Sequence, residues 1–415
     1  VTTLRTHMDN RLTTFPKLLQ EQGYQTSIFG KWHLGQGPEH CPTGFDDWAV
    51  LPGQGFYHNP MFIFKGPDGG TRRTVKGYVT DIITDMCLDW LENRDKNKPF
   101  CMLYHHKAPH REWEPDEKHL HMYANETIPE PETLFDTYEN RAAPAASARM
   151  RVGVHMNTRD IKCQINRDLP EMELRKWAYQ RYIKDYLRVI ASVDDNVGRV
   201  LDYLDDNNLT ENTIVVYTSD QGFFLGDHGW YDKRFMYEES LRMPFIMRYP
   251  KEIKAGSANG DIITNVDFAP TFLDYCSTDT PQEFQGRSFR GPARGETPED
   301  WQDSMYYRYW MNRSDHNVAA HYGIRTKRYK LIYYYCDGCG QKGADKEVMY
   351  SGGSEVGTDV IELSPEWELF DLEKDPYEMN SVYNDPAYAD VVKKLTAELD
   401  RKQKEVGDTP FEACE

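Results

Sequence analysis

Residues that can bind a cation or an anion gather near the middle of the 415-residue sequence. Asp220 and Gln221 lie just past residues 213–217, a β-branched run typical of a buried strand. A carboxylate beside an amide oxygen suits a hard cation such as calcium or magnesium. On its own the dipeptide is better explained as a polar turn. Four further polar residues follow within a short distance, however: Asp227, His228, Lys233 and Arg234. Burying so many charged groups near a strand end costs free energy unless a ligand or metal binds them.

A lysine and a histidine follow an earlier expected strand. Lys31 and His33 stand two positions apart, so in an extended loop they face the same side. A lysine that neutralises charge and a histidine that exchanges a proton near neutral pH together suit an anionic oxygen ester. Alone, the pair could equally be part of an exposed loop.

A third loop supplies His110, again beyond an expected strand. His105 and His106 precede it, and strand alternation places at least one of them inside the sheet as a core histidine. The joint occurrence of cationic, titratable and oxygen-donor side chains after three strands is far more specific than any one of them. The sequence therefore predicts one shared site.

The elements that must position these loops alternate between helix and strand. Helices are expected at 13–22, 81–92 and 182–204, and strands at 25–29, 99–104 and 213–217. This alternation predicts an α/β fold, with a mostly parallel central sheet flanked by helices. Ligands of such sheets gather beyond the carboxyl ends of the strands, where these polar loops lie.

Two further regions depart from this alternation of helices and strands. Residues 129–166 are irregular and hold a basic run at 141–151; a solvated loop is the simpler interpretation, with a substrate-shaping insertion or lid as the alternative. After residue 295 the pattern alternates as in antiparallel strands, and a helix is expected over 386–406. We therefore expect an α/β domain over 1–295 and a smaller α+β subdomain over 296–415.

Composition limits the partners. The formal net charge of −18 disfavours nucleic acid, so an anionic substrate needs a local cationic site. No apolar run approaches the roughly 20 residues of a membrane span. The Cys336–Cys339 pair favours a local disulfide or two inert thiols over a metal site, because no second ligand pair follows it.

At these residues the chain resembles the formylglycine-dependent sulfatases of the alkaline phosphatase-like superfamily. The resemblance covers nearly the whole chain, and its closest likeness is to N-acetylglucosamine-6-sulfatase-like members. It is carried by segments at 23–35, 217–222 and 225–233, with further blocks at 237–244, 267–272, 285–288, 323–326 and 369–376.

The resemblance implies a role for each candidate residue. Lys31 and Lys233 would hold the sulfate oxygens, His33 would assist the nucleophile, and His110 would protonate the leaving alcohol or contact the sulfate. Asp220 and Gln221 would bind Ca²⁺, with Gln in place of the commoner Asn or His. His228, Arg111 and Trp113 would contact the substrate. A sulfuric ester hydrolase acting on sulfated carbohydrate is implied, in the periplasm or secreted.

One departure from the family pattern concerns the nucleophile. That family converts a cysteine within Cys-x-Pro/Ala-x-Arg to formylglycine, and none of the eight cysteines fits. The paired aspartates that complete the calcium site are also missing from the sequence. We expect both in a segment before Val1, and we expect the chain as printed to be inactive. Two alternatives remain: a phosphate or phosphonate monoester hydrolase of the same superfamily, and a non-catalytic pseudoenzyme that binds sulfated glycans.

Overall fold

The computed structural model describes residues 6–313, 316–335 and 363–408. Its first part begins with helix α1 (Phe15–Glu21) and strand β1 (Gln25–Lys31), followed by β2 (Asp47–Leu51), β3 (Met61–Phe64) and β4 (Thr71–Thr74). Helix α2 (Val79–Asn93) then leads into β5 (Phe100–His105). Cys336 and Cys339, for which a local disulfide or two inert thiols are expected, lie outside the described residues.

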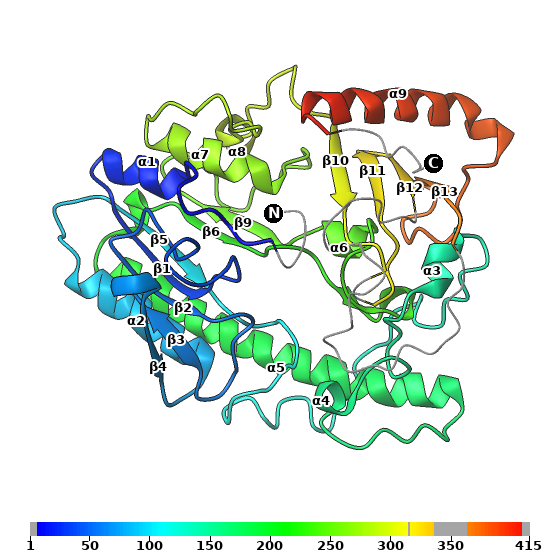
Figure 1. Ribbon diagram of the computed structural model, residues 1–415, viewed down its shortest axis with the longest axis horizontal. Coiled ribbons are helices and arrows are strands. Elements are labelled where there is room, and N and C mark those ends of the chain that lie inside the picture. Colours follow the sequence, from blue (N-terminus) through cyan, green and yellow to red (C-terminus); the bar gives the residue numbers. More distant parts are fainter. Residues whose placement is uncertain (1–5, 314–315, 336–362, 409–415) are drawn as a thin grey trace.

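These strands form one five-stranded sheet in the order β4-β3-β2-β1-β5. Strand β1 pairs in parallel with β2 and β5. Strands β2, β3 and β4 form an antiparallel meander, because the connections between them are too short for a crossover. Helices α1 and α7 (Phe268–Tyr275) lie on one side of β1 and β5, and α2 lies on the other (Figure 1). The predicted α/β fold is confirmed, but the sheet is mixed rather than mostly parallel.

The third predicted strand lies in a separate ladder. Strand β6 (Val215–Thr218) pairs antiparallel with β9 (Phe245–Arg248), after the long helix α5 (Glu171–Asp206), which packs on α2. Between these strands come the short hairpin of β7 (Phe224–Leu225) and β8 (Tyr231–Asp232) and the helix α6 (Glu238–Leu241). The loop after β6 carries Asp220 and Gln221, and the loop after β8 carries Lys233.

The irregular stretch at 129–166 is part of the interior. It contains the short helices α3 (Ala143–Ser147) and α4 (Thr158–Ile161) and places several apolar side chains in the main core, among them Leu134, Met150 and Val152. The simpler expectation of a solvated loop is therefore wrong. Periodicity could not reveal this packing, because these side chains are buried without a regular helical or strand spacing.

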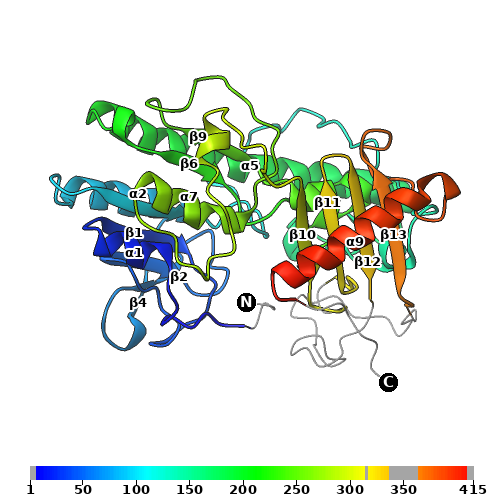
Figure 2. The same ribbon diagram turned by 90° about the horizontal axis from the view of Figure 1, so that it is seen from above.

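The C-terminal part forms an antiparallel sheet in the order β10-β11-β12-β13. Its strands are β10 (Ser304–Tyr309), β11 (His321–Thr326), β12 (Tyr329–Tyr334) and β13 (Glu366–Asp371). Helix α8 (Arg290–Ala293) precedes the sheet, and helix α9 (Ala389–Glu405) packs across it (Figure 2). The predicted antiparallel strands and closing helix are confirmed. The main apolar core continues into this sheet through side chains such as Ile332, Tyr334 and Phe370.

Candidate active site

Lys31 stands at the carboxyl end of β1, where Gly30 brings the strand close to β5. Gly30 has φ +109°, and a Cβ there would lie 1.8 Å from the His105 carbonyl oxygen, so only glycine fits. The Lys31 ammonium lies 3.7 Å from the Asp220 carboxylate in the loop after β6. Burial lowers the pKa of Lys31, while Asp220 opposes the shift. The two separate ladders thus bring their polar ends together.

Lys233 follows β8 and is held by its neighbour Asp232. The Lys233 ammonium lies 3.0 Å from one carboxylate oxygen of Asp232. The other oxygen contacts His316 Nε2 at 2.7 Å and the Arg234 guanidinium at 2.9 Å. Asp232 is buried, but these cations hold its pKa well below the usual range. A charged carboxylate therefore fixes Lys233 in place.

His110 is tied to the backbone of its own loop. Its Nδ1 lies 2.7 Å from the Arg111 carbonyl oxygen, and Lys107 donates to the same oxygen at 3.1 Å. Because a carbonyl only accepts, Nδ1 carries the proton of the neutral ring and leaves Nε2 as an acceptor. Burial, aided by Lys233 and Lys31, lowers the pKa of His110 to about 2.

His33 lies close to the same charged side chains. Its Nδ1 is 3.2 Å from the amide nitrogen of Gln54, and its φ of +51° turns the backbone sharply after β1. Burial and the charges of Lys31 and Lys233 lower its pKa. The structure thus brings Lys31, His33, His110, Asp220 and Lys233 into one site with a cationic character.

Some side chains of the site were missed by sequence reasoning. Lys107 is buried, its ammonium lies 4.6 Å from the Tyr57 ring centroid, and burial together with Lys31 lowers its pKa to about 8. Its place in the His110 loop was the available signal. Asp232, the sequence neighbour of Lys233, was also missed. Of the two preceding histidines, His106 is the interior one: both ring nitrogens are buried without a partner among the described residues.

Two of the three expected substrate contacts, Trp113 and His228, are enclosed in the interior. Trp113 is fully buried and donates from its indole to the Pro109 carbonyl. His228 is also fully buried, between the carboxylates of Asp136 and Glu239. A direct contact of Trp113 or His228 with substrate is therefore not supported, because apolar and charged neighbours enclose both.

Arg111 is held by structural contacts, although its side chain remains partly exposed. Its guanidinium bonds to Asp160 at 2.9 and 2.5 Å and lies over the Tyr231 ring. Sequence alone could not distinguish these structural partners from ligands, because the partners come from distant segments.

The candidate metal residues offer a partial coordination set. Asp220 is largely exposed, and Gln221 follows it directly in the loop after β6. Oxygen donors of this kind suit calcium, which takes six to eight of them. Within the described part of the chain, no cluster of three or more acidic, histidine or cysteine side chains could hold a metal ion. The two residues thus fit one side of a calcium site.

Comparison with known proteins assigns the chain to a family. Residues 3–278 match the sulfatase family, and residues 226–343 and 360–405 match the C-terminal region of N-sulphoglucosamine sulphohydrolase. Since the first match covers more than half of the chain, this protein belongs to the sulfatase family, whose members are sulfuric ester hydrolases.

Individual relatives agree with this assignment. N-acetylglucosamine-6-O-sulfatase of Bacteroides thetaiotaomicron is 43% identical, over 95% of this chain and 73% of the relative. A structure solved in complex with its substrate D-glucosamine-2-N,6-O-disulfate has a TM-score of 0.85 and 41% identity, over 98% of this chain and 84% of that one. An extracellular sulfatase of Drosophila melanogaster is 28% identical, over 68% of this chain and 24% of the relative.

Proposed function

We propose that this chain forms the greater part of an enzyme that hydrolyses the 6-O-sulfate ester of a glucosamine unit in a sulfated glycan. The observation that carries the proposal is the convergence of Lys31, Lys233, His33 and His110 at the ends of strands from separate ladders. Two lysines beside two histidines suit a sulfate ester, whose charge lies on its non-bridging oxygens. The related N-acetylglucosamine-6-O-sulfatase and the disulfate-bound structure support the sugar and the position.

In this mechanism the lysines bind and orient the ester. Lys31 and Lys233 contact the sulfate oxygens. The Asp232 carboxylate, 3.0 Å from the Lys233 ammonium, holds that ammonium in position. His110 is neutral in the free site because burial, and after it the two lysines, lower its pKa. A bound sulfate ester compensates those cations, so the pKa of His110 rises and its Nε2 can take up and deliver the proton that the leaving alcohol needs.

Two groups of the family complete this chemistry. Asp220 and Gln221 would hold one side of a Ca²⁺ ion, which neutralises developing negative charge when bound. Formylglycine, formed from a cysteine in that family, supplies the nucleophile. The 415 residues contain no Cys-x-Pro/Ala-x-Arg sequence, so a polypeptide of these residues is expected to bind the ester without hydrolysing it. Turnover by such a polypeptide well above background would contradict this expectation.

A binding measurement tests the proposal. We expect N-acetylglucosamine 6-sulfate to bind more tightly than N-acetylglucosamine in isothermal titration calorimetry. Lys233→Gln should weaken that binding on the order of tenfold, the effect of losing one charge-assisted hydrogen bond. Lys254→Gln is the matched control, because Lys254 is exposed on the segment after β9. Equal affinity for sulfated and unsulfated sugar would exclude the proposed function.

The same experiment separates the alternatives left open by the sequence. N-acetylglucosamine 6-phosphate binding clearly more tightly than the 6-sulfate would favour a phosphate or phosphonate monoester hydrolase. Binding of the sulfated sugar by the natural full-length product, with no hydrolysis after calcium is supplied, would favour a glycan-binding pseudoenzyme.

The expected location follows from the same family. A periplasmic or secreted enzyme would meet sulfated glycans, and a relative of the family in Drosophila melanogaster is extracellular. Among the described residues, every helix is too short or too polar to cross a bilayer. Fractionation of cells that produce the natural gene product, followed by detection with an antibody, tests this location; recovery in the cytoplasmic fraction would contradict it.

A further inference from the structure

A small basic pocket lies beside the C-terminal end of α3. It has a volume of about 130 Å³ and is lined by Ala146, Ser147, Ala148, Arg149, Arg151, His155 and Asn317. One water molecule needs roughly 10–15 Å³ of such space, so the pocket has room for a sulfate or carboxylate group. It falls in the basic run at 141–151, which the proposed reaction does not use.

Arg151, one of the cations that line this pocket, is poorly compensated by acidic side chains. Within the described part of the chain, no carboxylate forms an ion pair with Arg151 or with the neighbouring Arg167. One Arg151 terminal nitrogen donates to the Ala146 carbonyl at 2.9 Å, while its Nε is buried without a hydrogen-bond partner. Buried cationic donors without an acidic partner are costly, so an anion here would be stabilising.

His155 adds a neutral donor to these cations. Burial and the charges of Arg151 and Arg149 lower its pKa to about 3. Its Nδ1 accepts from the Arg151 backbone N–H at 3.1 Å, so the proton of the neutral ring stands on Nε2. The pocket thus offers both positive charge and an N–H group.

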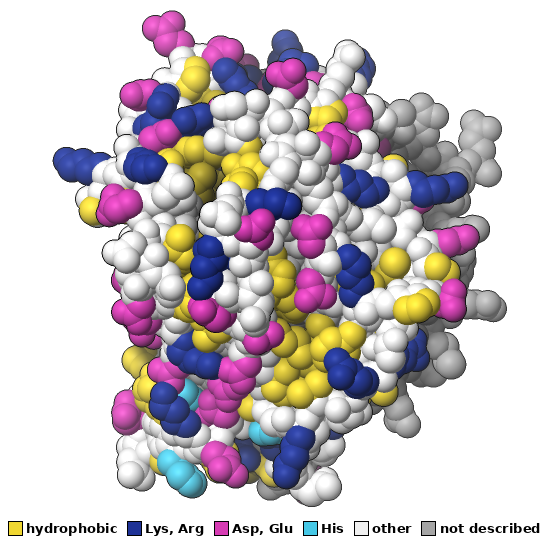
Figure 3. Space-filling view, turned by 90° about the vertical axis from the view of Figure 1, so that its left-hand side faces the viewer, with side chains coloured by type: hydrophobic (Ala, Val, Ile, Leu, Met, Phe, Trp, Pro, Cys, Tyr) yellow, Lys and Arg dark blue, Asp and Glu magenta, His cyan; other side chains and the backbone are white. Residues whose placement is uncertain are grey.

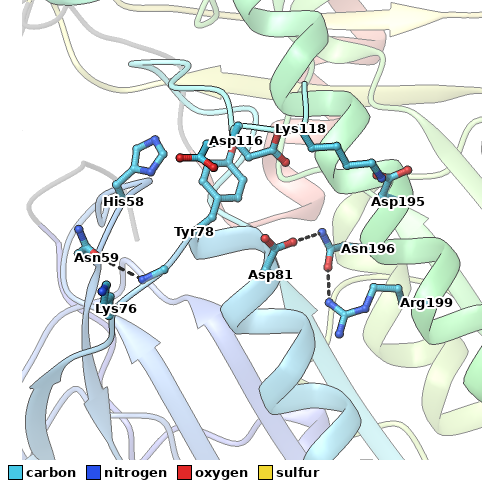
Figure 4. A pocket seen from close by; sticks show the side chains of 12 residues that line it. His58, Asn59, Lys76, Tyr78, Asp81, Asp116, Lys118, Asp195, Asn196 and Arg199 are labelled. Atoms are coloured by element: carbon cyan, nitrogen blue, oxygen red, sulfur yellow. Dashed lines mark hydrogen bonds and ion pairs between the residues drawn. The ribbon is translucent and has the colours of Figure 1, made fainter. Parts of the chain in front are cut away.

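A wider pocket of about 620 Å³ between α2 and α5 provides a contrast (Figure 4). There the charges already satisfy one another: Lys118 pairs with Asp195, and Arg199 bonds to Asp85 and Asn196. The Asn196 amide in turn donates to Asp81 at 2.7 Å. Positive and negative side chains are therefore balanced in that pocket, and we do not propose that it binds an anion.

The basic pocket is joined to the candidate active site through His316. The Arg149 backbone N–H donates to the His316 carbonyl at 2.6 Å, and His316 Nε2 contacts Asp232 at 2.7 Å. Asp232 in turn holds Lys233. The segment with Arg151 also runs beside β8, since the Tyr231 N–H donates to the Met150 carbonyl at 2.9 Å.

We propose that this pocket is a second anion subsite, which binds a sulfate or carboxylate group of the glycan other than the ester to be hydrolysed. The inference rests on the proposed function, because it assumes that the ester lies between Lys31 and Lys233. It makes the enzyme prefer glycans with more than one anionic group. A local cationic subsite also counters the acidic surface of the whole chain, which repels such polyanions.

The test compares ligands that have one anionic group or several. The probes are N-acetylglucosamine 6-sulfate, D-glucosamine-2-N,6-O-disulfate and a heparan sulfate tetrasaccharide, measured by isothermal titration calorimetry. Arg151→Gln removes the cation. Ala146→Glu places a carboxylate at an exposed position of the pocket and leaves the core untouched. Ala146→Gln is the matched neutral control, and thermal melting confirms that each variant folds.

We expect Arg151→Gln and Ala146→Glu to weaken tetrasaccharide binding about five- to tenfold. Binding of the monosulfated sugar should stay within about twofold of the wild type, and Ala146→Gln should behave as the wild type. If the disulfate responds like the tetrasaccharide, the second anionic group is on the same sugar; if it responds like the monosulfate, the group is on a neighbouring unit.

Other outcomes overturn the inference. Unchanged tetrasaccharide binding in both variants, or equal weakening for all three probes, would show that the pocket binds no second anionic group. Failure of the wild type to bind the monosulfated sugar would instead overturn the proposed function and, with it, this subsite.

Discussion

At the scale of single residues, the central feature is a pair of lysines that controls the titration of a neighbouring histidine. Burial lowers the pKa of His110 and of His33, and Lys31 and Lys233 lower both further. His110 is therefore neutral in the free site, and the pKa of His33 is shifted in the same direction. If the proposed sulfate ester binds here, its negative charge is expected to offset the lysines and to raise the pKa of His110.

A titration of His110 checks this coupling. Replacing Lys233 by Gln removes one cation, so the pKa of His110 should rise from about 2 towards the ordinary histidine value of 6.5. Saturating sulfate should raise it in the wild type as well. The measurement is the pH dependence of the His110 ring resonances in NMR spectra, with Lys254→Gln as control. A pKa that is the same in wild type and Lys233→Gln would contradict the coupling.

At the scale of elements, the short helix α4 fixes the His110 loop. Asn157 caps the helix by accepting from the Asp160 N–H, and Asp160 accepts from the Asn157 N–H in return. The fully buried Asp160 also holds the Arg111 guanidinium, and the Arg111 carbonyl accepts from His110. A helix of the irregular stretch thus positions a catalytic candidate from another loop.

Asp160→Asn tests this support. We expect a loss of about 2–3 kcal/mol in the free energy of unfolding, below the value for a fully buried pair because Arg111 is partly exposed. Affinity for N-acetylglucosamine 6-sulfate should fall as the His110 loop loosens. Urea unfolding and calorimetry measure the two effects. Asp168→Asn is the control, because Asp168 is exposed and close in sequence. A variant as stable as the control would refute the role of α4.

At the scale of the whole molecule, buried polar groups join the two parts of the chain. Lys330 of the C-terminal sheet is fully buried and pairs with Glu238 of α6 at 3.0 Å and with Glu378 at 2.6 Å. Glu368 of β13 accepts from the Ala142 N–H and the Tyr237 hydroxyl. The predicted division at residue 295 remains a prediction, but the apolar core and these contacts both cross it.

Charge on the outer surface has a different pattern. The face in Figure 3 shows acidic and basic side chains interspersed, with apolar side chains between them, and no broad field of one sign. An anionic glycan would therefore find its cations at the described sites rather than over this face.

His228 makes the stability of the molecule depend on pH. Burial opposes its charge, but the hydrogen bond to Asp136 and the Glu239 carboxylate 3.7 Å from Nε2 raise its pKa to about 9. A raised folded-state pKa gives stability that is complete below pH 6.5 and is lost as pH rises through 9. The difference in unfolding free energy between wild type and His228→Asn should shrink by on the order of 3 kcal/mol across this range.

Urea unfolding of both proteins at several pH values measures this difference. His121→Asn serves as control, because His121 is exposed and should show no such trend. A difference between wild type and His228→Asn that is constant from pH 6 to pH 9.5 would rule out the charged His228.

The sequence by itself determined the α/β class, the C-terminal antiparallel sheet and the loops that carry Lys31, His33, His110, Asp220 and Lys233, because local periodicity and motif chemistry report them directly. Tertiary structure decided that the sheet is mixed, that residues 129–166 are interior, and that Trp113 and His228 are core residues. It also supplied Lys107, Asp232 and the basic pocket. These features depend on contacts between segments that are far apart in the sequence. Composition and local residue spacing do not predict such contacts.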